Sequence, residues 1–297
     1  MSNLLVELSN ALANAAEKAA ASTVLVDARR RMPASGIAFA KDLVLTAHHV
    51  VERDEGIMVR LDSGEEVTAS LAGRDPGSDL AVLRLERAVA APAEPADTIK
   101  IGQLVLALGR PGRDGFEASL GVVSAIGGPL RTPHGSLEKY LRTDATLFPG
   151  FSGGPLVDAE GKVAGLNTSG FGPGAVLTIP AGTAWKIAAQ LAEHGSVMRG
   201  YLGIRSQLVE IPPAAQKTLA REQKMGLLVI SVEEGSPAEQ GSLMVGDILV
   251  GFGGAPVSDH EELFTRLTGE LVGQASVVEV LRGGYPVSLQ VKIGARR

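Results

Sequence analysis

One serine stands in a run of glycines directly before an apolar segment. The run reads PGFSGGPL and extends from Pro149 to Leu156. A hydroxyl that attacks a carbonyl carbon produces an oxyanion, which backbone N–H groups can stabilise. Glycine permits the positive φ of a tight loop, so Gly150 and Ser152 can turn their N–H groups toward one point, with Phe151 between them in the predicted oxyanion hole. The same letters also suit a Gly-Pro turn, so the interpretation depends on residues elsewhere in the chain.

A general base and an orienting acid precede this serine. The segment LTAHHVV holds His48 and His49, and the segment GSDLAVL holds Asp79. A serine hydroxyl needs a neighbouring imidazole to accept its proton, and the imidazole needs a carboxylate to fix its tautomer. Asp79 directly precedes a predicted strand, whereas Asp75 precedes a proline and fits a turn. These residue types predict a triad of Ser152, Asp79 and one of the two histidines.

Short strands must position these residues, because the chain is rich in turn formers and poor in aromatic side chains. It has 37 glycines, 16 prolines and 4% aromatic residues in a length of 297. Strand-like runs occur in two sets, separated by the Ala- and Pro-rich segment 88–98. This layout predicts a mainly β protein with two β-barrels and a cleft between them. The predicted strands cover 23–26, 35–39, 43–46, 66–71, 80–85, 104–109, 119–126, 140–143, 155–157, 163–167 and 175–179.

Helical spacing of apolar residues marks the ends of the predicted domains. Leucines and alanines recur every three or four residues near the N-terminus, so 1–22 is expected to be an amphipathic helix. A second helix over 183–194 closes the predicted barrel domain, 23–198. The remaining residues, 199–297, are predicted to form a small α+β domain.

Composition and charge argue against several classes of protein. The net charge of −5 disfavours non-specific nucleic-acid binding, and the basic run Arg29–Arg31 is interpreted as a solvated hairpin tip. The chain has no cysteine, no long apolar run and no metal or nucleotide motif, so we expect no disulfide, no membrane span and no cofactor. Met1–Ala20 lacks the features of a secretory signal. As it stands the sequence predicts a cytoplasmic protein, or a periplasmic one if a leader is missing.

At its three motifs the chain resembles the HtrA (Deg) family of serine proteases, which combine a chymotrypsin-like fold of two six-stranded β-barrels with a C-terminal PDZ domain. The family pattern TNAHVV is matched by Thr46–Val51, DLAV by Asp79–Val82, and TDAxxNPGNSGGPL by Thr143–Leu156. The resemblance covers nearly everything from the first predicted strand onward. Its alignment implies that His49 is the catalytic base, with His48 in the place of a small residue.

The resemblance also implies a substrate pocket. In this fold the residue six before the nucleophile lines the pocket floor, and here that residue is not acidic. A small or medium aliphatic side chain is therefore expected before the scissile bond. The expected pocket residues are Thr146, Thr168, Ala175 and Leu177.

A second binding site is implied in the C-terminal domain. The segment RGYLGI resembles the loop of HtrA-type PDZ domains whose backbone amides hold the carboxylate of a peptide C-terminus. A helix over 259–268, with Ser258 as its predicted N-cap, would form the other wall of the groove. The leucines of this helix also fit a simple core position. The expected peptide-binding residues are Tyr201, Leu202, Gly203, Ile204, Leu263 and Leu267.

Two phenylalanines depart from the family pattern. Phe148 and Phe151 stand where the family usually has asparagine. Donation by the backbone does not depend on that side chain, but an apolar ring cannot make the hydrogen bonds of asparagine. We therefore expect a poorly active, switchable resting enzyme whose oxyanion hole forms when Phe151 finds an apolar pocket on substrate binding.

Two functions from different classes of protein are compatible with these features. The first is an ATP-independent serine endopeptidase of protein quality control, which cleaves unfolded or damaged polypeptides through an acyl-enzyme and uses its PDZ domain to bind C-termini or regulate activity. The second is a peptide-binding or chaperone-like protein with little or no turnover. The complete triad favours the first, and the two phenylalanines favour the second. The resemblance further implies a homotrimer assembled through the protease domains.

Overall fold

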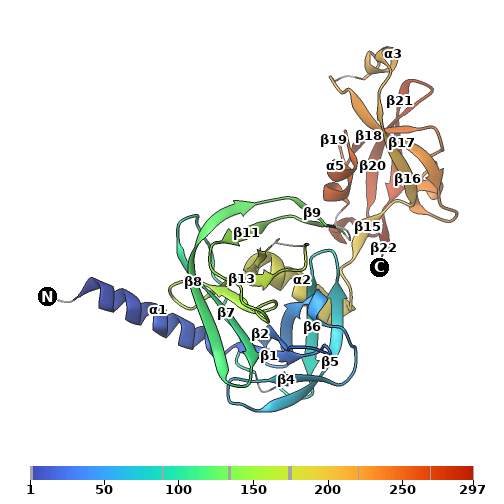
Figure 1. Ribbon diagram of the computed structural model, residues 1–297. Coiled ribbons are helices and arrows are strands. Elements are labelled where there is room, and N and C mark those ends of the chain that lie inside the picture. Colours follow the sequence, from blue (N-terminus) through green and yellow to red (C-terminus); the bar gives the residue numbers. More distant parts are fainter. Residues whose placement is uncertain are drawn as a thin grey trace. The chain divides into compact units, whose positions relative to one another are not determined.

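The chain forms two compact units, residues 1–197 and 198–297. The computed structural model describes residues 3–88, 90–132, 135–172, 176–219, 221–267 and 269–296. Strands predominate in both units (Figure 1), which confirms the predicted mainly β architecture.

Two closed six-stranded barrels make up most of the described part of the first unit, as predicted. The first barrel joins β1 (Thr23–Asp27), β2 (Ala34–Ala40), β3 (Leu43–Ala47), β6 (Leu80–Leu85), β5 (Glu66–Asp75) and β4 (Ile57–Arg60), in that order. The second barrel joins β11 (Tyr140–Thr143), β14 (Leu177–Pro180), β13 (Val163–Thr168), β12 (Pro155–Val157), β7 (Leu104–Gly112) and β8 (Gly115–Gly127). A separate ribbon pairs β9 (Leu130–Thr132) with β10 (Gly135–Leu137).

Strand pairing in the first barrel brings two residues of the predicted triad together. β3 and β6 are antiparallel neighbours, with Ala47 opposite Leu80. His49 lies two residues after the end of β3, in the short 3-10 helix η1 (His48–Val50), and Asp79 directly precedes β6. Nearly all residues of both strands are buried. The end of one strand and the start of its neighbour therefore present the histidine and the aspartate side by side.

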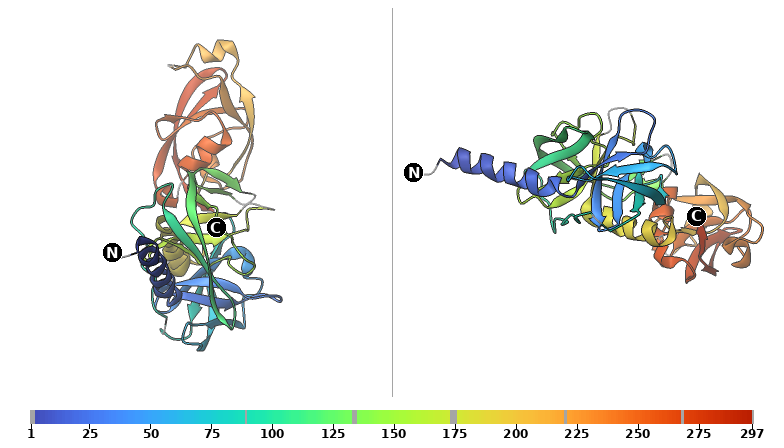
Figure 2. Two further views of the ribbon diagram at one scale, coloured as in Figure 1. Left: turned by 60° about the vertical axis from the view of Figure 1, so that its left-hand side comes forward. Right: turned by 90° about the horizontal axis from the view of Figure 1, so that it is seen from below.

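Two helices pack on the barrels. α1 (Leu4–Ala20) buries its last alanines, including Ala15 and Ala19, against the core of the first unit. Its N-terminal part extends beyond the barrels (Figure 2), and Leu4 and Leu5 are exposed there. α2 (Ala181–His194) follows β14 directly and is capped by Gly195, whose φ of 76° favours glycine. No helix in the described ranges has the length and apolar character needed to cross a membrane.

The second unit is a small sheet with short helices. Its strands run in the order β16 (Ile204–Glu210), β17 (Met225–Val232), β18 (Ile248–Phe252), β20 (Ala275–Arg282) and β21 (Tyr285–Lys292), and β19 (Ala255–Pro256) also pairs with β18. A ribbon joins β15 (Arg199–Tyr201) to β22 (Gly294–Arg296). The helices are α3 (Pro213–Gln216), α4 (Pro237–Gln240), α5 (His260–Arg266) and the 3-10 turn η2 (Gly269–Leu271).

The N-cap of α5 differs from the prediction by one residue. Asp259, not Ser258, has the extended cap backbone, and its carboxylate accepts the N–H of Glu262 at 2.9 Å. Ser258 instead donates its backbone N–H to the Glu262 carboxylate at 2.6 Å. Both residue types cap helices well, and the aspartate adds a favourable charge at the positive end of the helix dipole. The predicted helix also extended to Thr268, which lies outside the described residues.

Candidate active site

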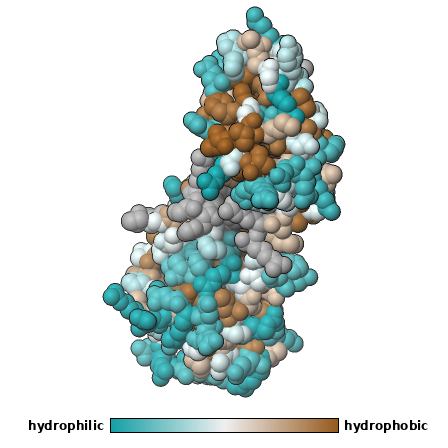
Figure 3. All heavy atoms as spheres, turned by 90° about the vertical axis from the view of Figure 1, so that its right-hand side faces the viewer, coloured by the Kyte–Doolittle hydropathy of each residue, from teal (hydrophilic) through white to brown (hydrophobic). Residues whose placement is uncertain are grey.

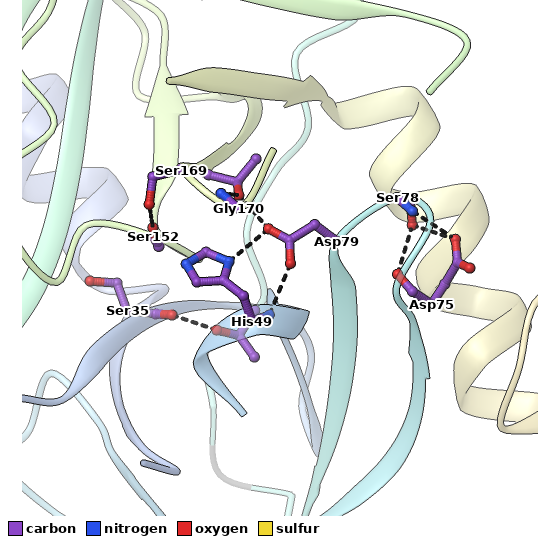
Figure 4. Close-up of polar contacts among 10 residues, drawn as sticks. Ser35, His49, Asp75, Ser78, Asp79, Ser152, Ser169 and Gly170 are labelled. Carbon is purple, nitrogen blue, oxygen red and sulfur yellow. Dashed lines mark hydrogen bonds and ion pairs between the residues drawn. The ribbon is translucent and has the colours of Figure 1, made fainter. Parts of the chain in front are cut away.

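The aspartate and the histidine of the predicted triad are in direct contact. His49 Nδ1 lies 2.8 Å from Asp79 Oδ2, and the backbone N–H of His49 donates to Asp79 Oδ1 at 2.9 Å. Figure 4 shows the imidazole between this carboxylate and Ser152. Because a carboxylate only accepts, the contact fixes the proton on Nδ1 and leaves Nε2 free to act as a base toward the serine.

Asp79 is held by residues from both barrels. Its side chain is 5% exposed, and it has a φ of 56°, unusual for a residue with a side chain. The hydroxyl of Thr168, at the end of β13, donates to the same oxygen that contacts His49. Gly170 follows closely, and a Cβ there would lie 2.3 Å from Asp79 Oδ2 and 2.7 Å from His49 Nδ1. Only glycine therefore lets the chain pass over this pair.

The Ser152 hydroxyl lies at the far side of the imidazole. Among the described residues its hydrogen-bond partner is Ser169, with 3.1 Å between the two Oγ atoms. In an unoccupied catalytic site, the serine–histidine hydrogen bond is often long or poorly aligned and shortens only when substrate is present. Ser152 and His49 line the same pocket, so the hydroxyl and the imidazole face one space.

The loop before the serine is a tight turn with two free amides. The N–H of Phe151 donates to the carbonyl of Phe148 at 3.0 Å, and Gly150, inside this turn, has a φ of 88°. Within the described chain, the N–H groups of Gly150 and Ser152 donate to no protein acceptor. These two amides are thus available to an oxyanion, as the glycine pattern suggests. Phe151, the third residue of the predicted hole, differs, because its N–H is used inside the turn.

Ser35, at the start of β2, fastens this loop to the first barrel. Its hydroxyl donates to the carbonyl of Gly150 at 2.7 Å and accepts the N–H of Arg110 at 2.8 Å. Its backbone N–H donates to the carbonyl of Ser152 at 3.1 Å, and its carbonyl accepts the hydroxyl of Thr46 at 2.7 Å. Ser35 is fully buried. The sequence interpretation missed this residue, because nothing in its local pattern marks a contact 115 positions away.

Phe151 occupies a filled apolar pocket made by the chain itself. The ring is fully buried in the core of the second barrel and meets Phe148 edge-on, with 5.4 Å between ring centroids. It lies so close to β7 that a Cβ on Gly109 would be 2.4 Å from its Cδ1 atom. The expectation of a ring that finds its pocket only on substrate binding is therefore not supported. The protein's own residues complete the pocket, and the ring serves as an anchor for the turn.

A pocket of about 320 Å³ adjoins the serine. Its lining includes the apolar side chains of Leu147, Phe148 and Val176 and no described acidic residue. The full lining is Arg29, Met32, His49, Leu147, Phe148, Pro149, Gly150, Ser152, Thr168, Ser169 and Val176. This composition suits an uncharged aliphatic side chain rather than a basic one.

The predicted pocket residues match this lining only in part. Thr168 is present, but its hydroxyl is engaged with Asp79, so it positions the acid. Thr146 and Leu177 do not line the pocket, since Leu177 is buried in β14 opposite Thr168, and the neighbouring residues Leu147 and Val176 take their places. Ala175 lies outside the described residues. Along extended backbone, adjacent side chains point to opposite sides, which explains an offset of one.

His48 differs from His49 in every contact that matters for catalysis. Its Nδ1 is buried without a hydrogen-bond partner among the described residues. Burial lowers the pKa of this imidazole below its ordinary value of 6.5, and the positive charge of Arg74 lowers it further. No described His, Asp or Glu side chains form a group of three or more that could hold a metal ion, so His48 is not a member of such a site.

In the second unit the predicted peptide-binding residues fall into two groups. Leu202, Leu263 and Leu267 are buried core residues, which is the alternative that the sequence left open for the helix leucines. The N–H groups of Leu202 and Gly203 donate to no described residue, and Gly203 has a φ of 83°. Successive free amides of this kind form an anion-binding loop.

The strand after this loop has a free edge. β16, which begins at Ile204, is the terminal strand of the sheet in the described region. His260, the first residue of α5, lies against it, with Nε2 3.1 Å from Ser206 Oγ. Exposed apolar side chains of this unit include Leu208, Ile230 and Phe264, and Figure 3 shows an apolar patch on one face of the unit. The hydroxyl of Tyr201 donates a hydrogen bond to the carboxylate of Glu233.

Two family models match the chain and define its class. A trypsin-like peptidase domain matches residues 34–166, and a PDZ domain matches residues 200–293. Two closed barrels and these two matches thus define a trypsin-like serine protease with a PDZ domain.

Individual relatives narrow this class. A solved structure of the HtrA-type protease AlgW with tripeptide has 31% sequence identity and a TM-score of 0.77, over 96% of this chain and 97% of that one. The serine endoprotease from Yersinia pestis has 29% identity and a TM-score of 0.76, over 96% and 98% of the two chains. The chain belongs to the HtrA family of serine proteases.

Curated relatives agree with this assignment. The probable periplasmic serine endoprotease DegP-like of Pseudomonas fulva is 36% identical over 269 residues, which are 88% of this chain and 55% of the relative. The protein of the same name from Hahella chejuensis is 36% identical over 281 residues. The chain spans little more than half the length of these relatives, at 55% and 59%.

Proposed function

We propose that this chain is an ATP-independent serine endopeptidase that cleaves unfolded or damaged polypeptides. Ser152 Oγ attacks the carbonyl carbon of the scissile bond while His49 Nε2 takes its proton. The N–H groups of Gly150 and Ser152 receive the oxyanion. His49 then gives the proton to the leaving amine, and the resulting ester on Ser152 is hydrolysed by a water molecule that His49 activates in turn.

One observation carries this proposal. His49, oriented by Asp79 at 2.8 Å, lines the same pocket as Gly150 and Ser152, whose N–H groups have no acceptor among the described residues. A base, its orienter and two oxyanion donors around one hydroxyl are the requirements for acyl transfer. The alternative function, peptide binding with little turnover, rested on the two phenylalanines. The buried ring of Phe151 removes that support.

The substrate pocket and the second unit define what is bound. The apolar lining around Leu147 and Val176 favours a small or medium aliphatic residue before the scissile bond. The free amides of Leu202 and Gly203 and the open edge of β16 favour capture of a peptide C-terminus as an added strand. Such capture selects polypeptides with an exposed C-terminus.

The test is degradation of casein, an unfolded protein, without added nucleotide. The wild-type chain should produce peptides, and the Ser152→Ala variant should produce none while keeping its circular dichroism spectrum, because little volume changes. Equal turnover by the two proteins would reject Ser152 as the nucleophile. Absence of turnover by a folded wild-type chain, on casein and on aliphatic peptide esters alike, would reject the proposed activity.

The family resemblance further supports a homotrimer formed through the first unit. The exposed apolar side chains of Leu4 and Leu5 on α1 support a share for this helix in assembly. Light scattering at micromolar concentration should give three times the monomer mass, and deletion of residues 1–20 measures the contribution of the helix. A monomer mass for the full chain would contradict the proposed homotrimer.

The compartment is proposed from the relatives. Their printed names describe periplasmic proteases, which favours the periplasmic alternative over the cytoplasmic one. Fractionation of the source cells, followed by detection with an antibody to this chain, separates the two.

A further inference from the structure

The turn between β1 and β2 carries three consecutive arginines, Arg29, Arg30 and Arg31. The sequence predicts a solvated hairpin tip, and the run does lie in the turn of this hairpin. The turn is not remote from the chemistry, however. Arg29 lines the same pocket as His49 and Ser152.

Ser152 lies between this hairpin and the strand β13. On one side its carbonyl accepts the N–H of Ser35, at the start of β2. On the other, its hydroxyl contacts Ser169, just beyond the end of β13. A polypeptide bound at Ser152 therefore lies in a pocket that Arg29 of the turn lines together with Ser169 and Val176.

The guanidinium of Arg29 is held close to the oxyanion loop. Its Nη2 donates to the carbonyl of Pro33 at 3.2 Å, and its Nε donates to the carbonyl of Met32. The same Pro33 oxygen lies 3.1 Å from the position that a Cβ on Gly150 would take. The cation is thus fixed by neutral carbonyls at a short distance from the reacting centre.

The positive charge of this turn is not neutralised by its acidic neighbours. Asp27 is paired with Arg53 at 2.8 Å. Glu52 accepts the backbone N–H of Arg30 at 3.3 Å, a contact that leaves the guanidinium free. No ion pair joins the three arginines to any described carboxylate. A second hollow beside the first is lined by Arg29, Arg30, Glu52 and Arg53.

We propose that the arginine turn, Arg29–Arg31, binds an acidic side chain of the substrate in the first three positions after the scissile bond. The residue before that bond is assigned to the apolar side near Val176, so the leaving segment occupies the hairpin side. Guanidinium groups match carboxylates in charge and in geometry. This inference rests on the proposed endopeptidase activity and adds a substrate preference to it.

The test uses internally quenched peptides that share one aliphatic cleavage site. They differ at a single position after the scissile bond, with Glu, Gln or Lys at each of the first three positions. At pH 8 and low salt, kcat/KM should rank Glu above Gln above Lys at one or more positions, by about two- to fivefold per step, the size of an exposed charge pair. The differences in kcat/KM should become smaller in 1 M NaCl, because the Debye length there is only about 3 Å and exposed charges are screened from one another.

Variants assign the preference to the turn. Arg29→Gln should abolish the ranking, and Arg29→Lys should keep most of it. Arg29 also donates hydrogen bonds to the carbonyls of Met32 and Pro33, so its replacement could change the turn itself. The double variant R30Q/R31Q removes positive charge and leaves those hydrogen bonds in place, and it should reduce the differences in kcat/KM. Arg87→Gln is the matched control, because Arg87 pairs with Glu65 beyond the opposite end of β6 from Asp79.

The outcomes separate this inference from the proposed function. Cleavage of all peptides with equal kcat/KM, or a ranking that survives both turn variants, overturns the arginine site and leaves the endopeptidase intact. Cleavage of no peptide by a folded wild-type chain overturns the endopeptidase itself. If Arg87→Gln also abolished the ranking, the preference would depend on the net charge of the protein, and a local site at the arginine turn would be rejected.

Discussion

The two halves of the active site are held by different forces. In the acid–base half, one buried carboxylate, that of Asp79, accepts hydrogen bonds from His49 and Thr168. In the oxyanion half, the turn is anchored by the buried ring of Phe151, and Ser35 supplies the polar contacts. The acid–base half therefore depends on individual hydrogen bonds, whereas the oxyanion half depends mainly on the packing of an apolar ring.

This difference explains how the chain can replace asparagine by phenylalanine next to its nucleophile. Donation to an oxyanion requires only that the N–H groups of Gly150 and Ser152 point outward. A buried ring packed against Gly109 anchors the turn without a side-chain amide, provided that no Cβ intrudes there. The two halves should therefore respond to different kinds of substitution.

The largest effect is expected in the acid–base half. Asp79→Asn keeps the volume but removes the charge and allows the wrong tautomer of His49. We expect kcat on an aliphatic peptide to fall by about 10⁴-fold. Thr168→Val, which removes one of the hydrogen bonds to Asp79, should lower kcat far less. Equal losses of kcat for the two variants would mean that the hydrogen bond from Thr168 matters as much for catalysis as the charge of Asp79, which would contradict this expectation.

A loss of roughly a hundredfold or more is expected when the ring of Phe151 is displaced. Gly109→Ala places a Cβ 2.4 Å from that ring, so the turn must shift and an oxyanion donor is lost. Phe151→Asn buries an amide in an apolar site and should likewise lower the basal rate. A clear rise in rate for Phe151→Asn would restore the idea of a switch that substrate must close.

Ser35→Ala should have an intermediate effect, about tenfold on kcat. The hydroxyl's bond to Gly150 is lost, and the Arg110 N–H is left without its acceptor. Because Ser35 positions the loop and does not bind substrate, KM should change little. Ser70→Ala, at an exposed site on β5, is the matched control. A rise in KM with unchanged kcat would place Ser35 in substrate binding instead.

The smallest effect on activity is expected for His48→Gln, which should retain most of the wild-type rate. Its consequence is for stability instead. The folded pKa of His48 lies below 6.5, so the unfolded chain binds a proton more readily as the pH falls. This contribution to stability is complete above pH 6.5 and is lost as the pH drops toward the folded pKa. Urea titrations at several pH values should show a shallower acid loss for His48→Gln than for wild type.

Much of the fold was predictable because its signals are local. Apolar alternation gave most barrel strands, and the spacing of alanines indicated α1. The short strand β4 (Ile57–Arg60) was missed, since four residues between turns carry little periodicity. The one-residue error at the N-cap of α5 arose because serine and aspartate cap equally well in sequence.

The sequence predicts those site residues that stand in a recognisable motif. It does not predict those whose role depends on a contact with a distant part of the chain. His49, Asp79 and Ser152 stand in recognisable segments, and the structure brings them together. The roles of Ser35, Gly109 and Thr168 come from contacts with loops far along the chain. No window of sequence holds both partners, so pattern alone could not assign them.

The central claim, that Ser152 is an activated nucleophile beside a formed oxyanion hole, is tested most directly with a fluorophosphonate probe. The serine oxygen displaces fluoride from phosphorus, and the remaining phosphoryl oxygen occupies the place of the oxyanion. Intact-mass analysis of the wild-type chain should show one adduct, which peptide mapping should place on Ser152. Labelling should be absent in Ser152→Ala, much slower in His49→Ala and retained in His48→Ala. An unlabelled wild-type chain that is folded, or an adduct on any other residue, would contradict the account.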